Sequence, residues 1–249
     1  CENNNIAFCS SPFDHQSVDL LQELDVPFFK VASGEITNLP LLEHISSYGK
    51  PIVLSTGMSN LDEIEDALSA IDEKSRKQVV LMHCVSDYPS KLEDANLRAI
   101  YVLKNAFHLP VGLSDHSEGI ELSLVAVGLG TVIIEKHITL DRNMIGGDHK
   151  ASLEPDEFKS MVEGIRRIEA ALGDGIKRCM PSEENVRDIA RKSVVASRKI
   201  LKGKKITEDD LAIKRPGTGI KPEYLNKIID MTANMDIAED SLIQWSQLK

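Results

Sequence analysis

The segment Val79-Val-Leu-Met-His-Cys-Val-Ser-Asp-Tyr-Pro89 changes within a few residues from an apolar run to a burst of polar side chains. A short apolar run bounded by turn-forming residues is typical of a buried β-strand, whose carboxyl end then carries the polar residues. The same pattern recurs at intervals of about 20–30 residues, the length of one strand, one helix and two turns. We predict strands at Ile6–Cys9, Phe28–Ala32, Pro51–Leu54, Val79–Met82, Val111–Leu113 and Val132–Ile134.

The segments between these runs have the period of an amphipathic helix. After the third run, for example, apolar residues recur at Leu61, Ile64, Leu68 and Ile71. Strands that alternate with such helices indicate βαβ units, in which a parallel sheet is covered by helices. The sequence therefore predicts an α/β fold.

Two α/β architectures compete at this point. A doubly wound sheet would normally carry a glycine-rich phosphate turn after its first strand, and no G-x-G-x-x-G occurs here. Polar residues instead follow every run, and in a (β/α)8 barrel all strands end at one mouth, where barrel enzymes have their active sites. We therefore predict a TIM (β/α)8-type barrel that lacks its first two strands in this chain. Because such a sheet leaves strand edges unpaired, we expect the chain by itself to be poorly active.

The pattern changes after a predicted helix at Asp156–Leu172. A turn-rich connection follows, and the last part of the chain has short β-like runs at Ser193–Ser197 and Leu211–Lys214. We predict a (β/α) barrel catalytic domain, incomplete at its N-terminus, then a linker and a small β-rich domain, over residues 1–175, 176–190 and 191–249.

The composition limits the classes of partner. Lys and Arg number 29 and Asp and Glu 39, a net charge of −10, which argues against a protein that coats nucleic acid or an anionic membrane. No apolar run approaches the roughly 18–20 residues of a membrane helix. The four cysteines form no C-x-x-C pair, so neither a disulfide framework nor a zinc knuckle is indicated. We expect a reduced, cytoplasmic protein that binds neither nucleic acid nor membrane.

Two histidines follow the last two predicted strands. Neighbouring parallel strands end about 5 Å apart, so His116 and His137 could together bind one metal ion. Alternation along the last strand places Glu135 on the same side as His137, with Lys136 facing the helices. Each histidine could equally be a hydrogen-bonded core or surface group.

Hydroxyl groups form a second set of candidates. A serine lies at or near the end of five successive strands, and Lys30 lies within the second strand. Hydroxyls around an ammonium group could bind a phosphate or carboxylate, although any one serine could be purely structural. These serines are Ser11, Ser33, Ser55, Ser86 and Ser114.

Other polar residues are candidates for acid–base work or for sugar binding. The best-placed carboxylates are Glu35 and Asp148, which could move protons or grip sugar hydroxyls. Tyr88 is either a loop anchor or a functional group.

These motifs, in order, resemble those of the sialic acid synthases, and the tail resembles their C-terminal antifreeze-like (SAF) domain. The barrel motifs are Ser10-Ser-Pro-Phe, Lys30-Val-Ala-Ser-Gly-Glu35, Leu54-Ser-Thr-Gly-Met58, His83-Cys-Val-Ser-Asp-Tyr-Pro89, Gly112-Leu-Ser-Asp-His116, Glu135-Lys-His137 and Gly147-Asp-His149. The tail motifs are Gly203-Lys-Lys-Ile and Lys214-Arg-Pro-Gly-Thr-Gly-Ile220. The resemblance covers essentially the whole chain and two independent modules.

The resemblance implies an enzyme that condenses phosphoenolpyruvate with N-acetylmannosamine or a 2,4-diacetamido relative, by C–O cleavage. The products are a nine-carbon 2-keto acid and phosphate. A divalent metal is implied, commonly Mn²⁺, with Mg²⁺ or Co²⁺ possible. A domain-swapped homodimer is also implied.

The resemblance also assigns roles to residues of this sequence. It implies metal ligation by His116 and His137, and recognition of the sugar's N-acetyl group by Arg215. Phosphoenolpyruvate would be held by Ser11, Lys30, Ser33, Ser55 and Ser114. The sugar or the reacting centre would be faced by Glu35, Tyr88 and Asp148.

Two features depart from the sialic acid pattern. Ser86 stands where sialic acid enzymes typically carry Asn, and the His-Cys-Val-Ser-x-Tyr-Pro form looks more like relatives that make legionaminic-type sugars. The family's first two strands, with a Glu and a phosphate-binding Lys, have no counterpart in this sequence.

Two rival hypotheses remain at this point. One is a Schiff-base aldolase on the same barrel, with Lys30 or Lys136 as nucleophile. Lys136 is out of phase with His137 and should point away from the mouth, which weakens that assignment. The other is a non-catalytic chain whose tail acts as a binding or assembly module.

Overall fold

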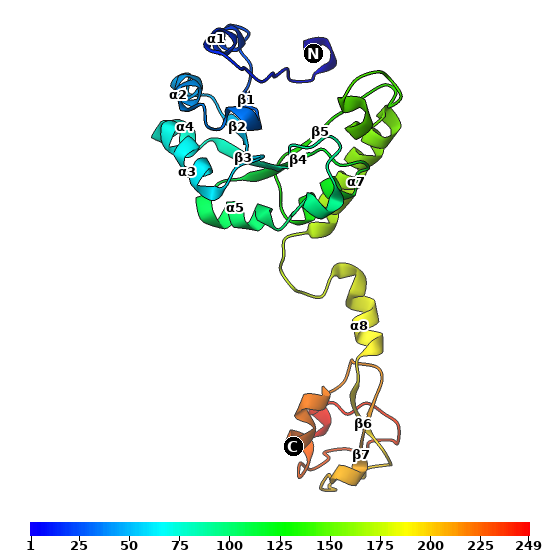
Figure 1. Ribbon diagram of the computed structural model, residues 1–249. Coiled ribbons are helices and arrows are strands. Elements are labelled where there is room, and N and C mark those ends of the chain that lie inside the picture. Colours follow the sequence, from blue (N-terminus) through cyan, green and yellow to red (C-terminus); the bar gives the residue numbers. More distant parts are fainter. The chain divides into compact units, whose positions relative to one another are not determined.

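The protein consists of two compact units. The computed structural model describes residues 1–249, apart from the side chain of Glu2. The barrel unit comprises Cys1–Asp174 and the C-terminal unit Gly175–Lys249 (Figure 1). In the described part of the chain, no helix has the length and apolar character needed to cross a membrane.

The barrel unit is built on a five-stranded parallel sheet in which each strand pairs with the next one along the chain (Figure 1). This consecutive order, with helices between the strands, makes a half-barrel and confirms the predicted fold class. The strands are β1 (Phe29–Val31), β2 (Ile52–Ser55), β3 (Val79–Cys84), β4 (Val111–Asp115) and β5 (Ile134–Lys136).

Seven α-helices of the barrel unit follow or connect the strands. The amino end of α3 shows how local sequence starts them: the Asn60 side chain accepts from the Glu63 amide, and the Glu63 carboxylate accepts from the Asn60 amide. The helices are α1 (His15–Glu23), α2 (Leu39–Ser47), α3 (Leu61–Ala70), α4 (Glu73–Arg76), α5 (Ala99–Phe107), α6 (Glu121–Gly128) and α7 (Pro155–Leu172). Short 3-10 turns lie at Glu2–Asn4, Ser33–Glu35, Leu92–Asp94 and Asp148–Ala151.

Alternation along the strands gives the sheet two different sides. On the helix-facing side the strands contribute fully buried residues such as Phe29, Leu54 and Leu81 to the core shared with the helices. The residues between them form the opposite side, which we call the polar face. Its polar members are Lys30, Ser55, Cys84, Ser114 and Glu135.

The predicted first strand is wrong. Ile6–Cys9 adopts no strand conformation, and Ile6 and Phe8 are 64% and 47% exposed. Its apolar composition favours burial, but a strand also needs backbone partners, and this segment pairs with no strand of the described sheet. The edges of that sheet are β1 and β5.

The C-terminal unit has its own small core around a two-stranded antiparallel sheet. Val194 and Ala196 on one strand are fully buried with Ile200 and Ile206. Part of the predicted linker is helical. The elements are α8 (Glu184–Ala190), β6 (Ser193–Ala196), β7 (Leu211–Lys214) and α9 (Leu225–Ile228), with 3-10 turns at Pro181–Glu183, Glu208–Asp210, Pro222–Tyr224 and Trp245–Gln247.

A buried carboxylate makes this unit sensitive to acid. Burial acts to raise the pKa of Asp210, but hydrogen bonds from Lys204 (2.5 Å) and from the Thr207 amide and hydroxyl (3.0 and 2.9 Å) outweigh it and hold that pKa below its ordinary value. A lowered folded-state pKa stabilises the fold above the ordinary value of 3.8, and this stabilisation is lost as the pH falls through the folded-state pKa.

We therefore predict that Asp210→Asn lowers the unfolding free energy of this unit at pH 7 and flattens its decline in acid. Trp245, the only tryptophan of the chain, lies in this unit, so its fluorescence during denaturant unfolding reports the change. Asp209→Asn is the control, because that neighbouring side chain is 86% exposed. Equal acid profiles for wild type and Asp210→Asn would contradict the prediction.

Candidate active site

Polar side chains from four strands meet on the polar face of the sheet. Lys30 on β1 donates to the Ser55 hydroxyl on β2 at 2.7 Å, and its Nζ lies 3.5 Å from Glu135 Oε2 on β5. Ser114 on β4 donates to the other oxygen of Glu135 at 2.6 Å. Lys30 and Glu135 belong to the two edge strands, so their contact spans the whole width of the sheet.

A second polar group lies at the ends of β2 and β3. The Ser33 hydroxyl accepts from the Gly57 amide at 3.1 Å and lies 3.2 Å from the Cys84 sulfur. A Cβ atom on Gly57 would lie only 2.4 Å from Ser86 Oγ and 2.8 Å from Ser33 Oγ. Glycine at this position therefore leaves room for the two serine hydroxyls beside its Cα.

The chain before Ser11 passes close to the Lys30–Glu135 pair. Burial and the negative charge of Glu135 raise the pKa of the Cys9 thiol, while Lys30 acts in the opposite direction. Ser11 itself is half-buried, and its hydroxyl has no hydrogen-bond partner within the described residues.

Three aromatic rings gather beside this network. The rings of His116 and His137 are 5.4 Å apart between centroids, and the Tyr88 ring lies 4.2 Å from the first and 5.7 Å from the second. Burial raises the pKa of the Tyr88 hydroxyl, and the charges of Cys84, Asp148 and Glu135 add to the effect. The two histidines predicted to act together are thus brought together.

The hydrogen bonds of His116 leave one ring nitrogen available. Its Nδ1 lies 2.7 Å from the Val85 carbonyl, which can only accept, so Nδ1 carries a hydrogen. Its Nε2 lies 3.2 Å from Ser114 Oγ, whose single hydrogen is donated to Glu135. Burial lowers the pKa of the imidazole, and this outweighs the opposing effect of the Val85 hydrogen bond. The ring is therefore neutral, with a lone pair on Nε2.

This arrangement fits a metal ligand, because a metal-bound histidine typically donates its other N–H to a carbonyl or carboxylate. No group of three or more His, Cys, Asp or Glu in the described chain has the geometry to hold a metal ion. A metal held by His116 and His137 would need substrate or water to complete its coordination.

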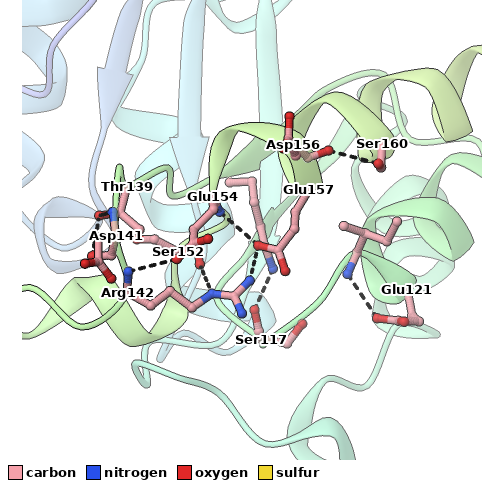
Figure 2. A network of polar contacts seen from close by, with 12 residues as sticks. Ser117, Glu121, Thr139, Asp141, Arg142, Ser152, Glu154, Asp156, Glu157 and Ser160 are labelled. Atoms are coloured by element: carbon pink, nitrogen blue, oxygen red, sulfur yellow. Dashed lines mark hydrogen bonds and ion pairs between the residues drawn. The ribbon is translucent and has the colours of Figure 1, made fainter.

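Asp148 lies in a loop that returns to the end of β5. The loop is closed at its base by hydrogen bonds of 2.9 Å from the Thr139 amide to the Leu153 carbonyl and from the Leu153 amide to the His137 carbonyl. Figure 2 shows the side of this loop, where Arg142 binds the Ser152 carbonyl and the carboxylate of Glu157. Within it, Asp148 is exposed and its Oδ2 lies 4.0 Å from His137 Nδ1.

Two further predicted residues have partners of their own. Glu35 is half-buried and accepts from the Asn38 side chain at 2.8 Å, and within the described residues it forms no hydrogen bond or ion pair with the Lys30 network. Arg215 belongs to the C-terminal unit, where its Nε donates to the Ala190 carbonyl at 3.1 Å. The adjoining loop is held by Ser193, which donates to the Pro216 carbonyl and accepts from the Gly219 amide.

Lys136 points away from the histidines, as its phase in the strand predicted. Its Nζ lies 3.1 Å from Asp115 Oδ2, and the two side chains are 0% and 1% exposed. Burial lowers the pKa of the ammonium group, and Asp115 opposes this. Enclosed in this way, Lys136 has no access to a substrate on the polar face.

Glu135, Cys84 and Gly57 were not predicted as site residues from the sequence. Glu135 could have been, because strand alternation placed it on the same side of the sheet as His137. The role of Gly57 could not be predicted, because it depends on Ser33 and Ser86, which come from other segments of the chain and lie beside it.

A cavity of about 380 Å³ lies on the helix-facing side, between the starts of α3 and α5. Its wall includes Asn60, Leu61, Arg98 and Val102, but neither Lys30 nor either site histidine. The polar face, which holds the charged and hydrogen-bonding groups, is therefore the candidate site.

We predict that His116 is neutral and protonated on Nδ1 at pH 7 and that it remains so below pH 6.5, the ordinary pKa of histidine. Long-range ¹H–¹⁵N NMR spectra of the ring nitrogens, assigned with His116→Gln, measure this directly. A ring protonated on Nε2, or charged at pH 7, would contradict the assignment.

Each of the two structural units matches a known protein family. The NeuB family model matches residues 1–177 and the SAF domain model matches residues 191–249. The chain is 50% identical over 242 residues to the N,N'-diacetyllegionaminic acid synthase of Campylobacter jejuni, covering 96% of this chain and 72% of that protein. The enzyme of the same name from Legionella pneumophila is 40% identical over 248 residues, covering 98% of this chain and 70% of that protein.

A solved structure has the same fold. The putative spore coat polysaccharide biosynthesis protein E of Chromobacterium violaceum superposes with a TM-score of 0.82 at 27% identity, covering 100% of this chain and 75% of that one. The family model spans more than half of the chain, and the relatives are matched over more than two thirds of their length. This chain belongs to the NeuB family and carries a C-terminal SAF domain.

Proposed function

We propose that this protein condenses phosphoenolpyruvate with an N-acetylated hexose, giving a nine-carbon 2-keto sugar acid and phosphate. The observation that carries the proposal is the convergence of one lysine, several hydroxyls and two histidines on the polar face. Two relatives at 50% and 40% identity are named N,N'-diacetyllegionaminic acid synthases. Together with Ser86, this favours a 2,4-diacetamido hexose over N-acetylmannosamine as the acceptor.

The phosphate of phosphoenolpyruvate requires positive charge and hydrogen-bond donors. Lys30 supplies the charge, and its ammonium group is mostly buried, at 13% exposure, so solvent screens it little. The hydrogen-bond donors would be the hydroxyls of Ser11, Ser33, Ser55, Ser86 and Ser114. The Gly57 amide orients the Ser33 hydroxyl, and the Ser114 hydrogen would turn from Glu135 to the anion. Without a bound anion, the carboxylate of Glu135 provides the counter-charge of Lys30.

The acceptor sugar would lie on the side of the site that carries Tyr88 and Asp148. Tyr88 is 44% exposed beside the histidines, and Asp148 lies within 4.0 Å of His137, so both can reach a bound sugar hydroxyl. Arg215 would bind the sugar's N-acetyl group from the C-terminal unit of a partner subunit in a swapped homodimer. The hydrogen bond from its Nε to Ala190 leaves its terminal nitrogens free to donate.

His116 and His137 would hold a divalent cation, with Mn²⁺ the first candidate and Mg²⁺ or Co²⁺ as others. When bound there, it would supply Lewis-acid polarisation of the sugar's aldehyde carbonyl. His116 presents its Nε2 lone pair to this position without a protonation change, since its ring is already neutral.

The chain's own residues account for the remaining steps. The methylene carbon of phosphoenolpyruvate forms a bond to the aldehyde carbon, whose oxygen takes up a proton, and water adds at C2 while a carboxylate accepts the proton that the water releases. Glu35 and Glu135 are the two candidates for this base, and Glu135 is the one bonded into the network. The tetrahedral ester then loses phosphate by C–O cleavage as the new C2 hydroxyl gives up its proton to form the ketone, with Lys30 and the serines stabilising the departing anion.

Lys30→Ala should raise the KM for phosphoenolpyruvate by about tenfold or more, corresponding to about 1.4 kcal/mol per decade, and leave the sugar KM nearly unchanged. Steady-state assays of phosphate release give both constants. Lys50→Ala is the matched control, because Lys50 pairs with Asp25 away from the site. An unchanged phosphoenolpyruvate KM would assign Lys30 a structural role.

Removal of divalent cations should abolish condensation, and added Mn²⁺ should restore it. His137→Ala should weaken Mn²⁺ binding, measured by calorimetry, because it removes one of two protein ligands. His83→Gln serves as control, since His83 is bonded to the Ala95 carbonyl and faces the helices. Full turnover by chelator-treated protein would exclude the metal from the reaction.

A further inference from the structure

A buried ion pair lies behind the two site histidines, on the helix-facing side of the sheet. Asp115 and Lys136 are directly paired residues of β4 and β5, and their charged atoms are 3.1 Å apart. Both side chains are almost completely buried, at 1% and 0% exposure. Neither contacts the Lys30 network, and the proposed reaction uses neither.

Every polar side-chain atom of this pair forms a hydrogen bond with a neighbouring residue. Asp115 Oδ1 accepts from the Ser117 amide at 2.9 Å and from its hydroxyl at 2.7 Å, and Oδ2 accepts from Ser123 of α6 at 2.8 Å. Lys136 donates to the Ser117 carbonyl at 2.6 Å; Ser117 is labelled in Figure 2. The pair thus ties the ends of β4 and β5 to each other and to α6.

The residues that make these contacts are next to the two histidines in the sequence. His116 lies between Asp115 and Ser117, both of which are fixed by the pair, and His137 directly follows Lys136. Fixing these neighbours fixes the two backbone positions from which the imidazole rings project.

Stability alone is a weak reason for such a pair. Removing two charges from water is costly, and a buried ion pair can often be replaced by uncharged residues of similar volume without loss of stability. What apolar residues do not supply is a directional set of hydrogen bonds joining two strand ends and a helix.

We propose that Asp115 and Lys136 are positioning residues that fix His116 and His137 relative to each other, so that both rings reach one cation. The inference rests on the proposed function only in assigning a cation to the two histidines. It makes the geometry of the site dependent on groups that touch neither substrate nor metal.

The test uses the double variant Asp115→Asn/Lys136→Met, which removes both charges without leaving one buried and unpaired. We expect cooperative unfolding close to the wild-type midpoint, but a Kd for Mn²⁺ that is about tenfold or more higher by calorimetry. Without metal, ¹H–¹⁵N spectra should show His116 losing its single Nδ1–H form. Wild-type affinity and unchanged ring spectra in the folded double variant would overturn the proposal.

A milder variant keeps the test decisive if the double variant does not fold. Ser123→Ala removes only the hydroxyl by which α6 holds Asp115, and it should weaken Mn²⁺ binding about threefold, less than the double variant does. The matched control is Ser75→Ala, because Ser75 is equally buried and its hydroxyl is bonded to the Ser46 carbonyl, far along the chain from the histidines. Equal Mn²⁺ affinities in both serine variants would overturn the proposal.

The same measurements separate this inference from the proposed function. Wild type that binds no Mn²⁺ would contradict the metal assignment, and the metal-free ring spectra would then decide the positioning role on their own. Wild type that binds Mn²⁺ alongside a double variant that binds it equally well would leave the function intact and exclude the positioning role.

Discussion

The contact between Lys30 and Glu135 is the constraint on which the site depends. These residues lie on β1 and β5, the two edges of the sheet, which share no backbone hydrogen bond. Their charged atoms can approach to 3.5 Å only because the parallel strands curl into a half-barrel. The same curvature brings Ser55 and Ser114 from the intervening strands onto this pair, so fold and site have one geometric origin.

Successive residues of each strand point to opposite faces of the sheet, so one face forms the core and the other carries the site. Residues such as Phe29 and Leu113 face the helices and are buried, whereas their neighbours Lys30 and Ser114 carry the polar network. Asp115 and Lys136 are the exception, because they are charged and yet lie on the apolar side. We attribute this exception to the histidines beside them, whose spacing an apolar pair would leave unfixed.

The sequence predicted the parallel sheet because five apolar runs are strong local signals, but it also predicted a strand at Ile6–Cys9 that does not form. Apolar character indicates burial without providing a backbone partner. Lys30, Ser55 and the two histidines could be predicted because strand ends converge in such folds. The role of Gly57, and the direct contact of Lys30 with Glu135, depend on curvature and on loops from distant segments, which no local pattern encodes.

The central claim is that phosphoenolpyruvate replaces Glu135 as the counter-charge of Lys30 on the polar face. A crystal structure of the protein with phosphoenolpyruvate and Mn²⁺ tests this most directly. The account predicts phosphate oxygens within hydrogen-bond distance of Lys30 Nζ and the Ser55 hydroxyl, with Lys30 further from Glu135 than 3.5 Å. Phosphate bound elsewhere, for example in the cavity beside Arg98, with the Lys30–Glu135 pair intact, would contradict it.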